Sequence, residues 1–240
     1  MSTYVCSDIH GKYNLWNKIK RKLKDSDRLV FLGDAADRGL NGYTIIKEIL
    51  ADPRITYIKG NHEDLLVKGM RTSHYGIRYS DDFNLWMYNG GGTTFDEMTE
   101  DIENDKVTSV IYQLADLPVT CEYTNKDGIH IYMSHAGFTL PDVPEFEDIL
   151  LWDREHILNK PSNIENSLII HGHTHSTHIQ SVLDNRAEFY HLPIGKDYTM
   201  LAKFGPIWYC NEEKLDMDCQ SAYTNHIAMI DLDTFQLTVF

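Results

Sequence analysis

The chain has 240 residues and a mass of 27.8 kDa. It carries 22 Lys and Arg residues against 36 Asp and Glu residues, a formal net charge of −14, and 42% of its residues are hydrophobic. That length and apolar content predict a single domain over residues 1–240 with a sizeable core. The acidic balance argues against nucleic-acid binding, because contacts to a phosphate backbone need clustered Lys and Arg side chains.

The sequence carries no signal for a membrane or an export pathway. Its longest apolar runs fall far short of the roughly 18 residues that a membrane span requires. The N-terminus has no basic region before its first apolar residues, which predicts that no secretory signal is present. The four cysteines are scattered and form no CxxC pair, as is usual in a reducing compartment. We therefore expect a cytoplasmic protein with no membrane partner.

Strand and helix signals alternate at the start of the chain. Short apolar runs at residues 3–6, 28–32 and 55–58 predict buried strands. Residues 12–24 and 43–50 carry apolar side chains at helical spacing and predict the two connecting helices. This order predicts right-handed crossovers and a parallel sheet.

The middle of the chain changes from helix to strand. Residues 62–117 have a helical pattern that the glycine-rich residues 89–92 should interrupt with a loop. Residues 119–123 and 129–133 then flank an Asn-Lys-Asp-Gly sequence, which predicts a β-hairpin.

The last third is the hardest part to interpret. Residues 167–170 predict a further buried strand, and residues 222–240 predict two strands around a turn. We interpret residues 192–218, which show no clear periodicity, as an irregular insertion.

Chemically distinctive residues follow each predicted buried strand. The segments are SDIHG (7–11), GDAADRG (33–39), GNHE (60–63), SHAG (134–137) and HGHTH (171–175). Because the carboxyl ends of parallel strands converge on one crevice, these segments should deliver their Asp, Asn and His side chains to one place. Mixed oxygen and nitrogen donors of this kind suit Mn, Fe or Zn.

The spacing suggests how two ions are shared. Asp8 and His10 lie two residues apart, so in an extended chain both side chains point the same way and can bind one ion together. Asp34 can bridge two ions with its two carboxylate oxygens. The second ion then takes the remaining ligands Asn61, His135 and His173. Two ions about 3.5–4 Å apart can clamp the attacking and leaving oxygens of an in-line displacement.

In this order, the five motifs resemble the calcineurin-like metallophosphoesterases. Asp37-Arg38-Gly39 and Glu63 resemble its phosphoprotein phosphatase branch, and within that branch the compact Ser/Thr phosphatases of the bacteriophage λ type. Residues 86–92, 151–155 and 223–233 support the same resemblance. It implies an α/β fold in which central β-sheets form a β-sandwich flanked by α-helices.

The resemblance also implies an activity and its cofactors. It predicts a phosphomonoester hydrolase that acts on a phosphorylated protein or a small phosphoester. A hydroxide that bridges two divalent metal ions would attack phosphorus in line, with Mn²⁺ the first choice and Fe or Zn as alternatives.

Roles for further residues follow from the resemblance and the chemistry together. Arg38 and Arg154 would bind the phosphoryl oxygens beside Asn61, since a planar guanidinium suits that task. His62 would protonate the leaving alkoxide, and Asp37 would orient its imidazole.

Three positions stand apart from the λ-type pattern or from its core motifs. Ser7 replaces the usual glycine, a small change that leaves the ligands intact. His175 follows His173 by two residues, as in the wider superfamily, where that histidine joins the first metal. Tyr223 is a candidate pocket wall.

Rival functions remain on the same scaffold. Symmetrical dinucleoside tetraphosphate hydrolases resemble this chain, but typically have Ala at the position of Asp37 and Asp at that of Glu63. Phosphodiesterase action is a further alternative. A metal-binding scaffold without turnover is a rival of another class, although such a protein has no need to keep both ion sites and the acid.

Overall fold

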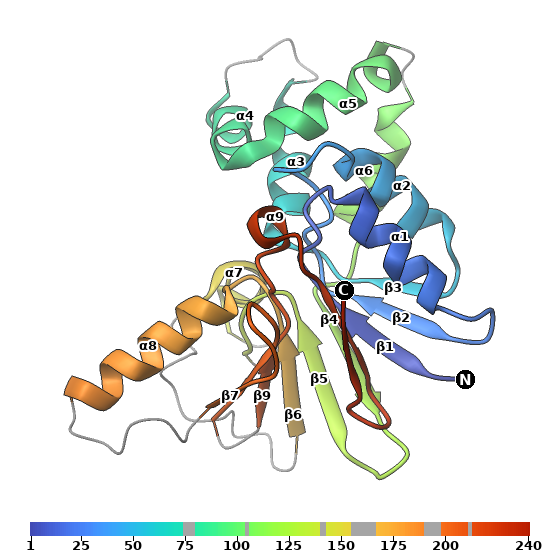
Figure 1. Cartoon of the computed structure of the whole chain (residues 1–240). Coiled ribbons are helices and arrows are strands. Elements are labelled where there is room, and N and C mark those ends of the chain that lie inside the picture. Colours follow the sequence, from blue (N-terminus) through green and yellow to red (C-terminus); the bar gives the residue numbers. More distant parts are fainter. Residues whose placement is uncertain (74–79, 104–105, 140–142, 155–166, 190–197, 211–212) are drawn as a thin grey trace.

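The computed structural model describes residues 1–73, 80–103, 106–139, 143–154, 167–189, 198–210 and 213–240 (Figure 1). Within these ranges two β-sheets pack against each other, and helices cover the outer side of one of them. The first sheet has the strand order β11 (Leu237–Val239), β10 (Ala228–Asp231), β1 (Thr3–Cys6), β2 (Arg28–Phe31), β3 (Ile55–Tyr57).

The first sheet confirms the predicted parallel unit. β1 pairs in parallel with β2, with Val5 opposite Val30, and β2 pairs in parallel with β3. On the other side β10 runs antiparallel to β1, so the C-terminal hairpin completes the sheet beside the N-terminal strand. β1 and β2 lie in the middle of the sheet, where both of their faces are covered and apolar side chains are favoured on each.

The two crossover helices are α1 (Tyr13–Lys22) and α2 (Gly42–Ala51), close to their predicted bounds. α1 buries Leu15, Trp16 and Ile19, which share one helical face. Its last turn is basic, which complements the negative end of the helix dipole. α2 ends where Asp52 becomes extended, because the following proline disfavours a helical conformation at the residue before it.

A group of helices stands above the end of the first sheet that carries the loops (Figure 1). Its members are α3 (Asn61–Ser73), α4 (Asp81–Trp86), η1 (Met87–Gly91), α5 (Gly92–Glu103) and α6 (Val107–Ala115). The helical pattern is interrupted at residues 89–92 as predicted, but by a kink at Gly90 between two helical segments and not by an extended loop. Gly90 adopts φ 100° at this kink, so the helical path changes direction there.

The second sheet has six strands within the described ranges. Their order is β4 (Thr120–Thr124), β5 (His130–Ser134), β6 (Ser167–His171), β9 (Lys214–Asp216), β8 (Ile207–Tyr209), β7 (Tyr198–Met200). The β4–β5 pair is the predicted hairpin, and β5 runs parallel to β6. Three further helices accompany this half, namely α7 (Phe146–Trp152), α8 (Ser176–Phe189) and α9 (Ser221–Thr224).

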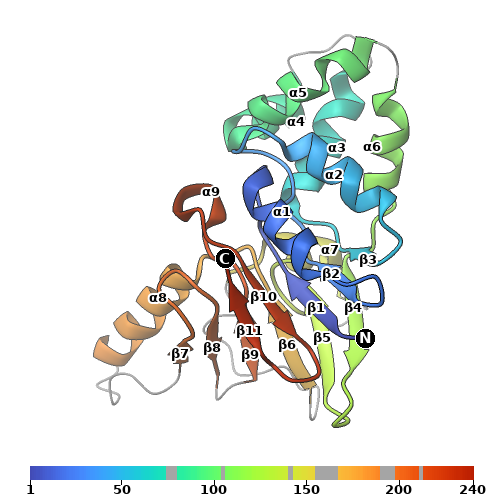
Figure 2. The same ribbon diagram turned by 45° about the vertical axis from the view of Figure 1, so that its right-hand side comes forward.

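Two predictions about this half are corrected. The ends of one parallel sheet do not by themselves bring the five segments together, because β5 and β6, which precede SHAG and HGHTH, belong to the second sheet (Figure 2). Residues 192–218, interpreted as an irregular insertion, contain β7, β8 and β9 within their described part. Three-residue strands are too short to show an alternating pattern, and their pairing partners are distant in sequence.

Two hydrophobic cores lie on the two faces of the first sheet. Between the sheets, Val5, Val30 and Leu32 of the first pack with Met133 and Ile170 of the second, among other apolar side chains. On the outer side of the first sheet, Leu29 and Phe31 pack with the helices. Successive residues of β2 therefore point into different cores, because side chains alternate between the two faces of a strand.

The described helices contain none that combines the length and the apolar character needed to cross a membrane.

The loops that follow β1, β2 and β3 pack so closely that glycine is required between them. A Cβ atom built on Gly60 would lie 2.3 Å from Asp34 Oδ1 and 2.5 Å from the Asp34 amide nitrogen. Both contacts are shorter than real Cβ atoms make, and one of them is to backbone, which cannot swing aside. Gly60 thus sets the distance between the second and third loops.

We predict that Gly60→Ala lowers the free energy of unfolding by about 1–3 kcal/mol through overpacking. Gly92→Ala is the matched control: Gly92 has helical φ and ψ, and a Cβ atom there meets nothing within 4 Å. The control should be neutral or stabilising by up to about 1 kcal/mol. Urea unfolding followed by circular dichroism measures both, and equal midpoints for the two variants would contradict the prediction.

Candidate active site

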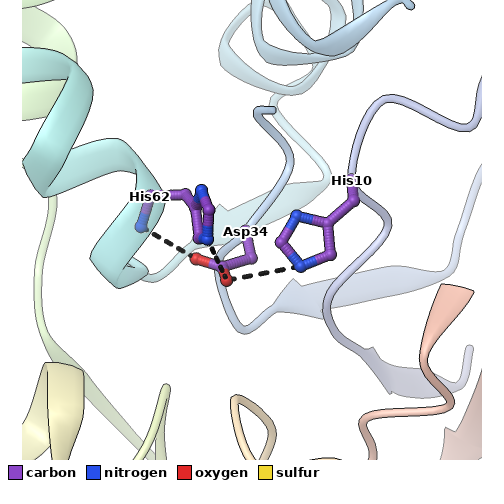
Figure 3. A group of neighbouring side chains, drawn as sticks. All are labelled: His10, Asp34 and His62. Carbon is purple, nitrogen blue, oxygen red and sulfur yellow. Dashed lines mark hydrogen bonds and ion pairs between the residues drawn. The ribbon is translucent and has the colours of Figure 1, made fainter. Parts of the chain in front are cut away.

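Asp34, in the loop after β2, lies at the centre of a buried group of histidines. Its Oδ2 is 3.6 Å from His10 Nε2 and 3.9 Å from His62 Nε2 (Figure 3). Its Oδ1 accepts a hydrogen bond from the backbone N–H of His62, at 3.1 Å. His10, Asp34 and His62 form a group whose possible ligand atoms all lie within 4.8 Å of one another.

A second group shares the same carboxylate. Asp34 Oδ1 is 3.4 Å from His135 Nε2, and these two residues with His173 form another set within 4.8 Å. Asn61, at the start of α3, completes it: its Oδ1 is 2.8 Å from His135 Nε2 and 2.9 Å from His173 Nδ1. His135 follows β5 and His173 follows β6, so this group joins the two sheets.

The donor set fits divalent metal ions. His135 Nδ1 lies 2.7 Å from the Leu32 carbonyl, and His10 Nδ1 lies 3.0 Å from the Ala36 carbonyl. A carbonyl only accepts, so each Nδ1 carries the proton and each Nε2 presents a lone pair toward Asp34. Lone pairs of nitrogen and oxygen that crowd together repel, and a cation among them removes that repulsion. The structure thus holds two buried groups able to bind metal ions.

The electrostatics of the groups favour the states that bind metal. Burial lowers the pKa of His10 well below its usual value, with the Arg38 charge as the next cause. Burial and then His135 lower the pKa of His173 in the same way, and Arg154 adds to the effect. The pKa of Asp34 lies far below its usual range: burial opposes this, but His135, His62 and His10 outweigh it. Neutral imidazoles and an ionised carboxylate are the forms that coordinate metals.

Asp8 lies in this centre without joining either group. It follows β1 and is buried, and its carboxylate accepts hydrogen bonds from the Ser7 hydroxyl and from the His173 backbone N–H, the latter at 3.1 Å to Oδ2. Burial, Asp218 and Asp34 raise its pKa well above the usual value. Its assignment as a metal ligand remains a prediction.

His175 also stands outside both groups. It is half-buried, and its Nε2 lies 3.7 Å from Oδ2 of the buried Asp218. Asp218, two residues after β9, was not identified from the sequence, since no motif marks it. The proposed ligand role of His175 remains a prediction, and Tyr223, predicted as a pocket wall, packs edge-on against its ring at 6.3 Å between centroids.

His62 is held by a chain of buried hydrogen bonds. Its Nδ1 lies 2.7 Å from Asp37 Oδ2, and a carboxylate only accepts, so Nδ1 donates. Asp37 in turn accepts from Trp86 Nε1, at 3.0 Å, and from the Thr94 hydroxyl, at 2.8 Å. Trp86 and Thr94 belong to the helical group, which therefore fixes the orientation of His62. The Asp37–His62 contact matches the sequence reasoning, whereas Thr94 carries no local signal that could have revealed it.

The two arginines occupy different positions. Arg38 donates from its two terminal nitrogens to His10 Nε2, at 2.7 Å, and to His62 Nε2, at 2.9 Å. Arg38 as a whole is exposed, so its guanidinium extends inward from the surface. Arg154 is exposed just beyond α7, and its charge acts on His173. The remaining donors of Arg38 are available to an anion in front of the histidines.

Glu63 holds the loops of the site together. It is fully buried, and its two oxygens accept from the backbone N–H groups of Asp34, Ala35, Ala36 and Gly60, at 2.8 to 3.3 Å. One carboxylate thereby ties the loop after β2 to the loop after β3. The sequence marked Glu63 only as part of a motif, because its backbone partners are invisible there.

Strained backbone is concentrated at the same place. Among the described non-glycine residues, eleven have positive φ, and six of these belong to the predicted site: Asp8, His10, Asp34, Asp37, Arg38 and His173. The left-handed region is unfavourable for residues with a Cβ and persists only where surrounding contacts impose it. The tight loops turn these side chains inward toward Asp34.

Comparison with known proteins agrees with this geometry. The family model described as calcineurin-like phosphoesterase matches residues 1–179. The chain belongs to this family. The two buried groups of His and Asp residues that could hold metal ions agree with this membership.

Relatives divide between two activities. Serine/threonine-protein phosphatase 2 of Escherichia coli K12 is 30% identical over 138 residues, which cover 56% of this chain and 58% of the relative. The symmetrical bis(5'-nucleosyl)-tetraphosphatase of Buchnera aphidicola (subsp. Schizaphis graminum) is 26% identical over 200 residues, 82% of this chain and 62% of the relative. The chain thus spans less than two thirds of the length of either.

Solved structures confirm the fold. A crystal structure of a candidate diadenosine tetraphosphatase superposes with a TM-score of 0.60 over 99% of this chain and 92% of its own, at 14% identity. At this identity the likeness concerns the fold alone, and it confirms the α/β arrangement of two sheets flanked by helices.

We predict that Asp34→Asn abolishes binding at both metal groups, because both include this carboxylate. After incubation with Mn²⁺ and desalting, the wild type should retain about two ions per chain and the variant almost none, by elemental analysis. Asp96→Asn, a change of an exposed carboxylate on α5, is the control and should bind as the wild type does. Full manganese retention by Asp34→Asn would refute the shared role of this residue.

Proposed function

We propose that the protein is a phosphomonoesterase of the Ser/Thr phosphoprotein phosphatase type, with two divalent ions, Mn²⁺ first among them. The buried Asp37–His62 hydrogen bond is the observation that carries the proposal. It supplies an oriented proton donor beside Asp34, which is what release of a poor alkoxide leaving group requires.

The metal ions and the protein side chains would have different roles in the reaction. Divalent ions, when bound, neutralise phosphoryl charge and favour ionisation of water. Asp34, His10, Asn61, His135 and His173 would hold them, with Asp8 as a further proposed ligand. Within the first group, His62 would serve as the acid and not as a ligand. A buried, rigid donor set fixes their positions before the substrate arrives.

Arg38 would bind and orient the phosphoryl group. Its terminal nitrogens already touch His10 and His62, and each keeps a further N–H that can donate to phosphoryl oxygens. Arg154 approaches from the α7 side, near His173. We propose that the two guanidinium groups and Asn61 together set the in-line orientation of the ester.

His62 would act as the general acid through Nε2. Because Nδ1 donates to Asp37, protonation of the ring would take place at Nε2, where the proton replaces the hydrogen bond that this atom accepts from Arg38. Burial lowers the pKa of His62, but Asp34 and the hydrogen bond to Asp37 outweigh it and raise that pKa overall. A raised pKa keeps the acid form populated near neutral pH.

The rival is symmetrical dinucleoside tetraphosphate hydrolysis, which the Buchnera relative performs by name. In the resemblance drawn from the sequence, those enzymes typically have Ala at the position of Asp37. The three donors that surround the Asp37 carboxylate, from His62, Trp86 and Thr94, favour the phosphatase. A phosphate anhydride has a better leaving group than a phosphoserine ester and depends less on an acid.

The test is a substrate panel with Mn²⁺, comprising p-nitrophenyl phosphate, a phosphoserine peptide and diadenosine tetraphosphate. We expect kcat/KM for the phosphopeptide to exceed that for the dinucleotide, and Asp34→Ala to lose activity on every substrate. Faster turnover of the dinucleotide would transfer the proposal to the rival. Wild-type turnover no higher than that of Asp34→Ala would overturn both.

We predict that His62→Asn lowers kcat by about 10²–10⁴-fold on a phosphoserine peptide, as loss of a general acid does, and much less on p-nitrophenyl phosphate. Asparagine cannot protonate an alkoxide, while p-nitrophenolate needs no proton. The manganese content of His62→Asn is measured in parallel. If it equals that of the wild type, the loss of activity does not come from damage to the metal groups. Equal losses on both substrates would show that His62 is not the acid.

A further inference from the structure

A groove opens beside the candidate active site and shares Arg38 with it. It has a volume of about 540 Å³ and is lined by residues 11–14, 17 and 38–41, the start of α1 and the loop that leads into α2. Arg38 forms part of this lining, and its terminal nitrogens contact His10 and His62. A substrate whose phosphoryl group faces those histidines can therefore extend along the groove.

The lining is positive in a strongly acidic protein. Its charged side chains are Lys12 and Arg38, and it includes no Asp or Glu, although the chain as a whole has a net charge of −14. Lys12 makes no ion pair with any carboxylate of the described ranges. Asn17 and Asn41 add amide groups that can donate hydrogen bonds.

We propose that this groove binds an anionic group carried by the substrate next to its scissile phosphoryl, with Lys12 as the residue that selects for it. The inference rests on the proposed hydrolase activity and deepens it. The anion can be a carboxylate beside a phosphoserine or a further phosphate of a nucleoside polyphosphate, since both offer oxygens to a cation. Substrates with a cation at that position are disfavoured by Lys12 and Arg38.

The expected contribution of Lys12 to the affinity for an anionic group follows from the position of its side chain. Its side chain is half-buried at the wall of the groove, so the attraction is that of a partly screened pair, worth a few fold in affinity. Reversal of the charge replaces attraction by repulsion and about doubles the difference in free energy. The preference should also weaken as salt rises toward 0.5 M, where screening acts over only a few ångströms.

The experiment compares three phosphoserine peptides that differ only at the residue after phosphoserine, which is Glu, Ala or Lys, together with diadenosine tetraphosphate. p-Nitrophenyl phosphate, which carries no second anion, reports whether the metal centre works in each variant. The variants are Lys12→Glu and, as a matched control, Lys18→Glu. The control makes the same charge change at an exposed position of α1 outside the groove.

We expect the wild type to prefer the Glu peptide over the Lys peptide in kcat/KM. Lys12→Glu should reduce that ratio about three- to tenfold, mainly through KM, and Lys18→Glu should leave it as in the wild type. A loss confined to the dinucleotide supports the groove with phosphate as its anion. Unchanged peptide selectivity together with an unchanged kcat/KM for the dinucleotide in Lys12→Glu, or equal losses on all substrates including p-nitrophenyl phosphate, overturns the proposal. Absence of wild-type turnover on every substrate refutes the proposed hydrolase instead.

Discussion

The site is organised around one buried carboxylate. Asp34 faces His10 and His62 with one oxygen and His135 with the other, so both metal-binding groups depend on it. An ionised carboxylate without such partners is very costly to bury. Here the backbone N–H of His62 donates a hydrogen bond to it, and bound cations would neutralise its charge. The tight loops, the shared glycine contact and the strained backbone all serve to keep this carboxylate in place.

Two further buried carboxylates, those of Glu63 and Asp37, hold the loops and side chains around Asp34 in place. Glu63 ties the loop after β2 to the loop after β3 through backbone N–H groups. Asp37 links His62 to the helical group through Trp86 and Thr94. A change in the packing of α4 or α5 would therefore reach the candidate acid through hydrogen bonds, although neither helix holds a metal ligand among the described residues. This arrangement explains why helices far along the chain pack against the loops of the first sheet.

Charge is distributed unevenly over the molecule. The chain is acidic overall, yet the groove beside Arg38 is lined by two cations and by neutral amides. Such local focusing of positive charge would favour an anionic substrate at the site. The relatives act on phosphoproteins or on dinucleoside tetraphosphates by name, and both kinds of substrate can carry an anion beside the cleaved phosphoryl.

The sequence by itself determined the parallel β1–β2–β3 unit, the β4–β5 hairpin and the residues that meet at the site, because these depend on local periodicity and on motifs at strand ends. Only the tertiary structure decided that His135 and His173 approach from a second sheet, that β7, β8 and β9 complete that sheet, and that Trp86, Thr94 and Asp218 support the site. Those features depend on pairings between segments far apart in the chain. Neither the period of a short strand nor the identity of a lone Thr or Asp encodes its distant partner.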